Sequence, residues 1–220
     1  MLPAATDAQS TAFGRLEITF DDRVLHPRSW TQAQSTWAAA LLTDAPDSSR
    51  VLELCAGAGH IGLLALVEAR SEHTLVAVDL SPAACVFARR NAAAAGMSDR
   101  VEVREGRIDD VLEPDERFEL VIADPPWVRR SDTGRFPGDP LIAIDGGADG
   151  LDLAWSCLRT SASHLVPGGS VVLQLGSVTQ VDRIRDGLRS TGSALTVHEV
   201  RSFGERGLLV RLVNATKGNP

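Results

Sequence analysis

The chain has 220 residues, of which 44% are hydrophobic and 23% are charged, and its net charge is −7. This composition is typical of a globular protein and excludes a disordered, fibrous or collagen-like chain. The acidic balance is poorly suited to wrapping a nucleic-acid backbone, although it allows a local basic patch. Three widely spaced cysteines, Cys55, Cys85 and Cys157, form no CxxC pair and indicate reduced thiols instead of a disulfide framework or a zinc site.

The N-terminal residues and the apolar segments both argue against export and membrane insertion. Residues 1–10 contain neither the basic nor the apolar region of a signal peptide. No apolar run approaches the roughly 18 residues that a membrane span needs. We therefore predict a cytoplasmic protein without membrane contacts, and we expect its first dozen residues to be frayed.

Apolar residues follow the spacing of alternating strands and helices from residue 51 onward. Before this stretch we expect a strand at 15–20 and a helix at 31–43. The later strands are expected at 51–55, 74–79, 101–105, 120–124, 170–176, 194–200 and 207–213. The later helices are expected at 60–70, 82–96, 151–165 and 179–191. The alternation predicts an α/β fold with a parallel sheet and helices on both faces, and the last two strands predict an antiparallel hairpin.

A glycine-rich turn lies between the strand at 51–55 and the helix that follows it. Gly57, Gly59 and Gly62 match the spacing GxGxxG, and Asp79 ends the next strand 22 residues after Gly57. Glycines let a ligand approach the backbone, the helix start offers N–H groups, and Asp79 can accept both hydroxyls of a ribose. His60, which opens the helix, is expected to face solvent, with contact to the ligand as the alternative. A nicotinamide dinucleotide and S-adenosylmethionine both fit this pattern.

The charge of Glu53 separates these two ligands. A dinucleotide brings a pyrophosphate, which a nearby carboxylate would repel, whereas S-adenosylmethionine brings an ammonium and a sulfonium that favour an anion. The run Glu53-Leu54-Cys55-Ala56-Gly57-Ala58-Gly59 resembles the first motif of class I methyltransferases, with Cys55 where many members have a glycine. This resemblance, together with the C-terminal hairpin, implies a seven-stranded Rossmann-like methyltransferase sheet and S-adenosylmethionine as the cofactor. We interpret Cys55 as a small residue that fills a tight turn.

The strand at 120–124 runs into Asp124-Pro125-Pro126-Trp127, where ligands bind in open α/β sheets. This run resembles the [DNS]-P-P-[YFW] motif of methyltransferases that act on planar amide or amino nitrogens. Such a nitrogen is a poor nucleophile because its lone pair is delocalised. Asp124 and the Pro125 carbonyl can accept its N–H bonds, the two prolines fix the backbone, and Trp127 can stack on the flat group. The Pro- and Gly-rich loop at 125–150 is too long for a simple connector, which indicates a functional loop.

Four further segments match one protein family in register. They are the segments 24–32, 136–151, 165–169 and 176–180. Their patterns, including V-L-x-P-R at the first segment and G-G-x-D-G-L at the second, resemble the glutamine-N5 methyltransferases that modify peptide-chain release factors. The similarity covers roughly residues 20–213, and four segments in register are hard to obtain by chance.

Three departures from this family bear on the methyl acceptor. The family motif is usually Asn-Pro-Pro-Tyr, whereas this chain has Asp124 and Trp127. The family carries an N-terminal helical domain that helps to hold the release factor, and only about fifty residues precede the glycine loop here. The acidic residue expected near the adenine aligns with Arg107, and Asp109 is the alternative. Methylation of a nitrogen is therefore better supported than glutamine as the particular acceptor.

We accordingly predict an S-adenosylmethionine-dependent N-methyltransferase that acts on a planar nitrogen of a protein side chain or a small molecule. The alternatives are methylation of an RNA or DNA base, which the acidic charge disfavours, and a fold relative that binds without transferring. The acceptor is assigned to Asp124, Pro125, Pro126 and Trp127. The cofactor is assigned to Glu53, Cys55, Ala56, Gly57, Gly59, Asp79, Leu80, Asp109 and Asp124. No metal is expected, and the oligomeric state stays open.

The chain is expected to form one catalytic domain with an extension. We assign residues 1–45 to an N-terminal extension that packs on the core and residues 46–214 to the methyltransferase domain. Residues 215–220 are expected to be a flexible tail, because they are small, polar and follow the last predicted strand.

Overall fold

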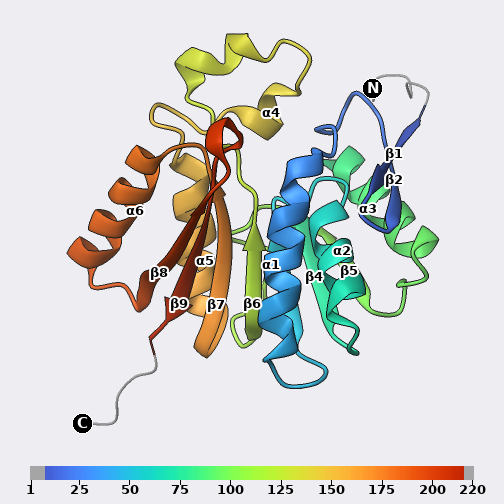
Figure 1. Ribbon diagram of the computed structural model, residues 1–220, viewed down its shortest axis with the longest axis horizontal. Coiled ribbons are helices and arrows are strands. Elements are labelled where there is room, and N and C mark those ends of the chain that lie inside the picture. Colours follow the sequence, from blue (N-terminus) through green and yellow to red (C-terminus); the bar gives the residue numbers. More distant parts are fainter. Residues whose placement is uncertain (1–7, 216–220) are drawn as a thin grey trace.

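The computed structural model describes residues 8–215, and its centre is a seven-stranded sheet (Figure 1). The strand order is β5-β4-β3-β6-β7-β9-β8. The strands are β3 (Arg50–Leu54), β4 (Thr74–Asp79), β5 (Val101–Glu105), β6 (Phe118–Ala123), β7 (Leu165–Leu175), β8 (Leu195–Ser202) and β9 (Leu208–Asn214). Neighbours from β5 to β7 run parallel, and β9 runs antiparallel to β7 and β8. The predicted fold is confirmed.

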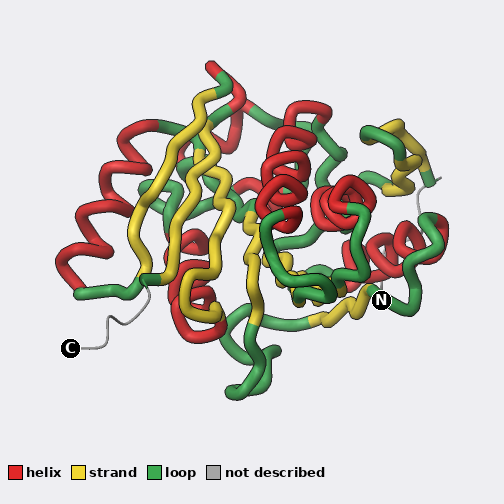
Figure 2. Tube along the Cα trace, turned by 60° about the horizontal axis from the view of Figure 1, so that its bottom comes forward, coloured by secondary structure: helices red, strands yellow, loops and turns green. Residues whose placement is uncertain are grey.

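Helices cover both faces of this sheet, as Figure 2 shows from a second direction. The α-helices are α1 (Gln32–Thr43), α2 (His60–Ala69), α3 (Pro82–Ala94), α4 (Leu141–Ile144), α5 (Asp152–His164) and α6 (Val178–Thr191). The first three share one hydrophobic cluster with the sheet, and α5 and α6 share a second. Successive strand residues point to opposite faces, so Leu75 and Ala77 belong to the first cluster and Val76 and Val78 to the second.

The N-terminal residues correct one expectation. Residues 9–12 are not frayed, because β1 (Gln9–Phe13) pairs antiparallel with β2 (Leu16–Phe20). Phe13 is fully buried and packs edge-on against His60, which anchors an otherwise polar strand to the core. Residues 1–7, also expected to be frayed, lie outside the described residues, as does most of the tail predicted at 215–220.

A buried asparagine fastens this N-terminal hairpin to the rest of the fold. The side-chain oxygen of Asn91 in α3 accepts a hydrogen bond from the N–H of Thr19 at 2.9 Å. Its Nδ2 donates to the carbonyls of Thr19 and Ala58, at 3.0 and 2.9 Å. Asn91 therefore satisfies backbone groups of β2 and of the glycine loop at once, which fixes the hairpin beside that loop.

Strand β7 begins five residues earlier than predicted. Leu165 pairs with Phe118, and Ser170 pairs with Leu120, so the four residues between them bulge out of the ladder. The bulge holds Pro167-Gly168-Gly169, with Gly168 at φ 81°. A turn was expected from these residues, and it exists as an interruption inside one strand because pairing resumes on both sides.

The 125–150 loop rises above the carboxyl ends of the strands (Figure 1). It contains a 3-10 helix, η2 (Arg130–Arg135), and the single-turn helix α4. A β-bridge between Val128, before η2, and Asp145, after α4, closes the loop around both. The shorter 3-10 helices of the chain are η1 (Ser29–Thr31) and η3 (Gly204–Arg206). The loop is thus folded, although none of its residues belongs to either core cluster and Leu151, which follows it, belongs to the second.

Candidate functional site

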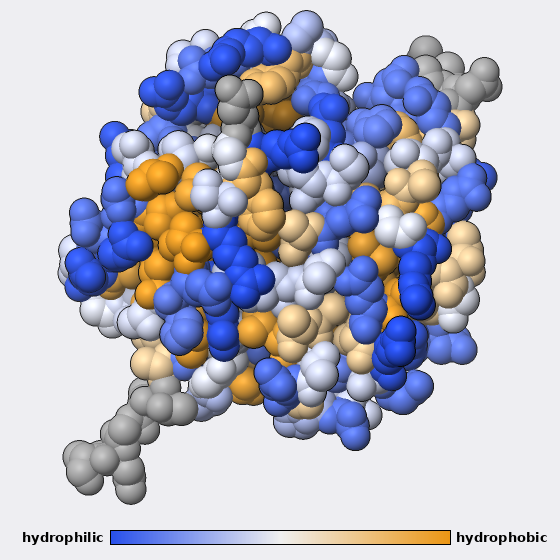
Figure 3. All heavy atoms as spheres, in the orientation of Figure 1, coloured by the Kyte–Doolittle hydropathy of each residue, from blue (hydrophilic) through white to orange (hydrophobic). Residues whose placement is uncertain are grey.

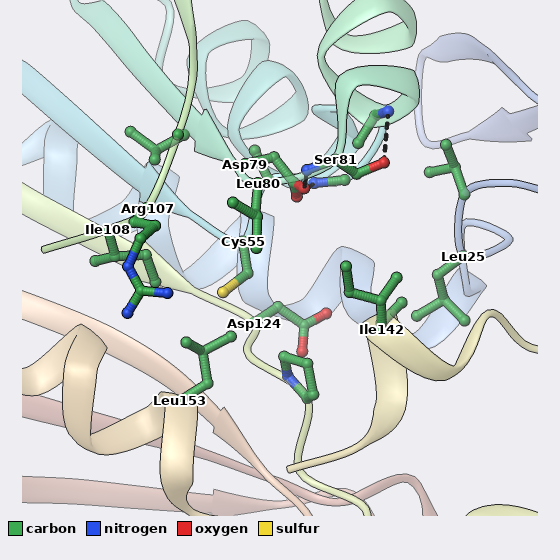
Figure 4. A pocket seen from close by; sticks show the side chains of 18 of the residues that line it. Leu25, Cys55, Asp79, Leu80, Ser81, Arg107, Ile108, Asp124, Ile142 and Leu153 are labelled. Carbon is green, nitrogen blue, oxygen red and sulfur yellow. Dashed lines mark hydrogen bonds between the residues drawn. The ribbon is translucent and has the colours of Figure 1, made fainter. Parts of the chain in front are cut away.

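An open cavity lies at the carboxyl ends of β3, β4 and β6, where the strand order reverses (Figure 4). Its empty volume is about 1050 Å³, part of which is open to solvent. The residues from the predicted site that line it are Cys55, Ala56, Gly57, Asp79, Leu80, Asp109, Asp124 and Pro126. Glu53, Gly59, Pro125 and Trp127 do not line it.

The glycine loop is held by its own backbone. The N–H of Ala56 donates to the carbonyl of Val78 at 3.0 Å, and that of Gly59 donates to the carbonyl of Ala56 at 2.8 Å. Gly57 has φ 54° and open space where a Cβ would lie, so its backbone faces the cavity without cover. Gly59, with φ 77°, precedes α2 and packs against Ala88. The two glycines supply the left-handed turns that start the helix beside the cavity.

Asp79 ends β4 and closes this loop from the other side. Its Oδ2 accepts the N–H of Gly57 at 2.8 Å, and its Oδ1 accepts the N–H of Ser81 at 2.8 Å. Burial raises the pKa of Asp79 above its usual value, against the effect of these N–H groups. Each oxygen keeps a lone pair for a further donor, so the carboxylate can receive hydroxyls from the cavity while it braces the loop.

Cys55 stands where the backbone is left-handed, with φ 60°. An L side chain is strained in this conformation, which explains why a glycine would fit the same turn. Its thiol faces the cavity close to Asp124 (Figure 4) and packs against the second core cluster. The neighbouring Cys157 thiol, together with burial, raises the pKa of Cys55 well above the usual value. The thiol is therefore a poor nucleophile at neutral pH.

Glu53 lies behind the glycine loop, where it is 2% exposed. Its Oε1 accepts the N–H of Gly62 at 3.0 Å, whereas its Oε2 has no partner in the described structure. Burial raises the pKa of Glu53 to about 8. A Cβ at Gly62 would collide with Oε2, so this third glycine of the motif makes room for the carboxyl group. Glu53 thus meets the start of α2 from inside the protein.

The end of the cavity beside the carboxyl ends of β4 and β5 combines apolar side chains with charged ones. Leu80 is 52% exposed and Ile108 is buried, and both line the cavity. Arg107 and Asp109, the two residues that competed for the adenine in the sequence, both line this end and approach each other at 3.9 Å. Figure 4 shows Arg107 and Ile108 on the side of the cavity away from Leu25.

Asp124 follows β6 and points into the cavity opposite Asp79 (Figure 4). Its carboxylate has no hydrogen-bond partner in the described part of the chain, and burial raises its pKa to about 7. Its own N–H donates to the carbonyl of Leu54, which ties the start of the 125–150 loop to β3. Pro126 also lines the cavity, and Pro125 is buried beside it.

Trp127 lies in a second, polar cavity on the other side of the motif. Its ring covers Gly176, where a Cβ would collide with the indole. Its carbonyl accepts a hydrogen bond from Nε2 of Gln180 at 2.9 Å. The same amide donates to the carbonyls of Asp149 and Gly150, and its oxygen accepts the N–H groups of residues 176 and 177. Gln180 therefore clamps both ends of the 125–150 loop to the end of β7.

The sequence reasoning missed part of the cavity lining. Arg23, Val24 and Leu25 form one wall, although their segment carried a motif, because no pattern shows which distant residues a connecting segment will face. His60 is 8% exposed, not solvent-facing as expected, since the N-terminal hairpin covers it. Burial lowers its pKa to about 3. Ile142 of the 125–150 loop closes the cavity near Leu25 (Figure 4).

The strand order of the sheet and the position of this cavity match a Rossmann-like methyltransferase fold. A methyltransferase from Pyrococcus furiosus superimposes on 93% of this chain and 91% of its own, with a TM-score of 0.66 and 18% identity. Residues 33–184 match the methyltransferase small domain family, and the chain belongs to that family. None of the helices between residues 8 and 215 has the length and apolar character needed to cross a membrane.

Two curated relatives are glutamine methyltransferases. The ribosomal protein uL3 glutamine methyltransferase of Bradyrhizobium diazoefficiens is 33% identical over 187 residues, which cover 79% of this chain and 57% of the relative. The release factor glutamine methyltransferase of Cereibacter sphaeroides is 34% identical over 168 residues, which cover 74% and 57%. The chain thus spans little more than half the length of the curated relatives it matches.

Proposed function

We propose that this chain is an S-adenosylmethionine-dependent methyltransferase that modifies a planar nitrogen, with a glutamine side chain of a protein as the acceptor. Its family and the names of its relatives support this activity and this acceptor class. The observation that carries the proposal is Asp124, an unpartnered carboxylate that faces the same cavity as the glycine loop.

The residues of the cavity fit the cofactor. Asp79 offers lone pairs to the ribose hydroxyls, and Leu80 and Ile108 offer apolar surface to the adenine, with Asp109 as the polar contact. Gly57 gives the ligand access to the backbone. Glu53 would act through the start of α2, since it does not reach the cavity itself. The bound cofactor supplies an electrophilic methyl group.

The acceptor amide would lie between Asp124 and the cofactor. A carboxylate at this point accepts N–H bonds, which holds the amide plane so that the nitrogen faces the methyl group. Most of the rate gain in such a transfer comes from holding the reacting atoms about 3 Å apart in line. Pro125 and Pro126 restrict the backbone that carries Asp124, and Trp127 would border the path of the acceptor from the second cavity.

Asp124 also has a pKa suited to the proton that the nitrogen must lose. Because burial raises this pKa to about 7, the carboxyl group exchanges protons near neutral pH. We assign it first to orientation, since the resembling family carries an asparagine at this position. We further propose that residues 46–214 form the catalytic domain and that 1–45 are an extension whose residues 23–25 complete the cavity.

Methyl transfer can be tested with the purified chain, radiolabelled S-adenosylmethionine and a lysate separated into protein, RNA and small molecules. We expect label in the protein fraction and, after digestion and mass spectrometry, a mass increase of one methyl on a glutamine. Cofactor binding measured by calorimetry on the same preparation separates a failed transfer from a failed binding. Label confined to RNA would replace the proposed acceptor, and the absence of cofactor binding would overturn the activity itself.

A further inference from the structure

The cavity continues past the residues assigned to the nucleoside. Arg23, Val24 and Leu25 line its other end, together with His60 and Ile61 at the start of α2. Figure 4 shows Leu25 across the cavity from Arg107, with Asp124 between them. If the nucleoside lies at the Arg107 end, the amino-acid portion of the cofactor extends toward the end formed by residues 23–25. That portion carries an ammonium and a carboxylate.

A carboxylate needs a cation at this end. Asp79 and Asp124 both face the cavity and would repel a further anion. His60 offers no positive charge, because burial lowers its pKa to about 3. Of the residues that line the cavity in the described part of the chain, the permanent cations are Arg107 at the nucleoside end and Arg23 at this end.

Arg23 is held in one orientation by Asp21. Its Nε donates to both oxygens of Asp21, at 3.1 and 3.0 Å, and its Nη2 donates to Oδ2 at 2.6 Å. Asp21 is 1% exposed, and its Oδ1 also accepts the backbone N–H of Arg23 at 3.0 Å. The hydrogen bonds to Arg23 lower the pKa of Asp21, so the pair stays ionised at neutral pH.

The pair leaves half of the guanidinium unused. An arginine has five N–H donors, and the contacts with Asp21 occupy one on Nε and one on Nη2. The remaining three lie on Nη1 and Nη2, whose outer edge matches the two oxygens of a carboxylate. The Arg23 side chain keeps 31% of its surface exposed, so this edge is accessible.

We propose that Arg23, oriented by the buried Asp21, binds the carboxylate of the amino-acid portion of the cofactor and so selects amino-acid-bearing nucleosides over those without this group. The inference rests on the proposed function. It assigns Arg23 to affinity and selectivity and assigns Asp21 to positioning.

Calorimetry with two adenosine derivatives that are not methyl donors tests the assignment without any methyl transfer. S-adenosylhomocysteine carries the carboxylate, and 5′-methylthioadenosine has the same nucleoside and sulfur without the amino-acid end. For Arg23→Ala we expect affinity for S-adenosylhomocysteine to fall by about 10-fold to 100-fold, as for a lost charge-assisted hydrogen bond. Affinity for 5′-methylthioadenosine should change by less than about twofold.

Three variants serve as controls for this measurement. Arg23→Lys keeps the charge without the flat edge and should lie between wild type and Arg23→Ala. Asp21→Asn should reproduce part of the loss for S-adenosylhomocysteine only. Arg107→Ala removes an arginine of the same cavity at the nucleoside end and should change both affinities by the same factor. Thermal unfolding of each variant identifies any that fails to fold.

The outcomes separate this inference from the proposed function. If wild type binds neither nucleoside, the proposed function fails. If wild type binds both, and Arg23→Ala and the well-folded Arg23→Lys weaken both equally or neither, the cofactor site stands and the role of Arg23 is refuted.

Discussion

The glycine loop and the 125–150 loop follow neighbouring parallel strands, β3 and β6, yet different contacts fix their positions. The glycine loop is short and is braced by backbone bonds to β4 and by Asp79. The 125–150 loop has backbone bonds within itself, such as those between Val128 and residues 144 and 146, and side chains attach it to the rest of the protein, with Gln180 at both ends and an ion pair between Arg28 and Asp139 near its middle. It also exposes Leu141 and Ile142, at 59% and 61%.

This difference separates what the fold fixes from what the sequence can vary. The backbone bonds of the glycine loop do not depend on the neighbouring side chains, so the path of the chain sets much of the cavity end that we propose for the cofactor. A loop held by side chains changes its shape when a few of them change. We therefore expect acceptor choice to reside in the 125–150 loop, and mutations in the two regions to affect different measurements.

The largest effect is expected from Asp124, which directly precedes the 125–150 loop and faces the same cavity as the glycine loop. Asp124→Ala should lower the methyl-transfer rate by about 100-fold or more, as for removal of a preorganised electrostatic group. Asp124→Asn keeps the shape and one acceptor oxygen and should retain a measurable fraction of activity. Cofactor affinity should be nearly unchanged in both. Equal loss in the two variants would instead assign Asp124 to general-base catalysis.

The wild-type rate should also depend on pH through Asp124. Its pKa is raised to about 7, so the carboxyl group is mostly protonated below that pH and mostly ionised above it. Only the ionised form is a full acceptor at both oxygens, so the rate should rise with pH, with its midpoint at about 7, and level off at higher pH. A pH–rate profile of the Asp124→Asn variant should lack this step. A wild-type rate that fell with rising pH would contradict the sign.

Substitutions of Asp79 test the role of the glycine loop in binding the nucleoside. Asp79→Ala should weaken S-adenosylhomocysteine binding by about 1.5–3 kcal/mol through loss of charge-assisted hydrogen bonds. Asp79→Asn keeps one acceptor and should lose less. Asp110, which is exposed next to the cavity, offers a matched control in Asp110→Ala. Calorimetry measures all three, and equal affinity of Asp79→Ala and wild type would remove Asp79 from the ribose site.

Substitution of Gln180 tests which contacts fix the 125–150 loop. Gln180→Ala removes five hydrogen bonds to the backbone and should lower the free energy of unfolding by about 2 kcal/mol. Hydrogen exchange should quicken in the 125–150 loop while the amides of the glycine loop keep their protection. Thr179→Ala, at an exposed neighbouring position, should change neither. If hydrogen exchange in the 125–150 loop of the variant equalled that of wild type, other contacts would hold this loop.

The smallest effect concerns Cys55 and the backbone of the first region. With φ 60°, Cys55→Gly should be more stable than Cys55→Ala by about 1 kcal/mol, because both lose the thiol and only glycine adopts this conformation without strain. Elsewhere in the chain alanine is normally the more stable of the two. Chemical denaturation of both variants measures the difference, and a more stable alanine variant would contradict it.

The parallel sheet could be predicted because its strands are apolar on both faces. Residues 51–54 and 120–123 are nearly continuous hydrophobic runs, and burial in the centre of the sheet requires this. Strand β1 could not be predicted, because Gln9–Phe13 is mostly polar and gains its stability from pairing with β2 and from burial of Phe13. Such tertiary gains leave no periodic signal in the sequence.

The site shows the same division. Gly57, Asp79 and Asp124 were predicted because their residue types at strand ends carry their own chemistry, and all three face one cavity. Arg23 was not predicted and solvent exposure was favoured for His60, because their places depend on how the N-terminal hairpin folds over α2. Trp127 is the last residue of the motif but lines the second cavity, since its ring covers Gly176. Its role toward the acceptor stays a prediction.

The side-chain bonds of the N-terminal segment have a consequence for the order in which a growing chain completes its cavity. Thr19 bonds to Asn91, which is 72 residues later, and Arg28 pairs with Asp139, which is 111 residues later. During synthesis these early residues leave the ribosome long before their partners exist. The wall formed by residues 23–25 therefore closes only after most of the sheet has been made, so a nascent chain completes this cavity late.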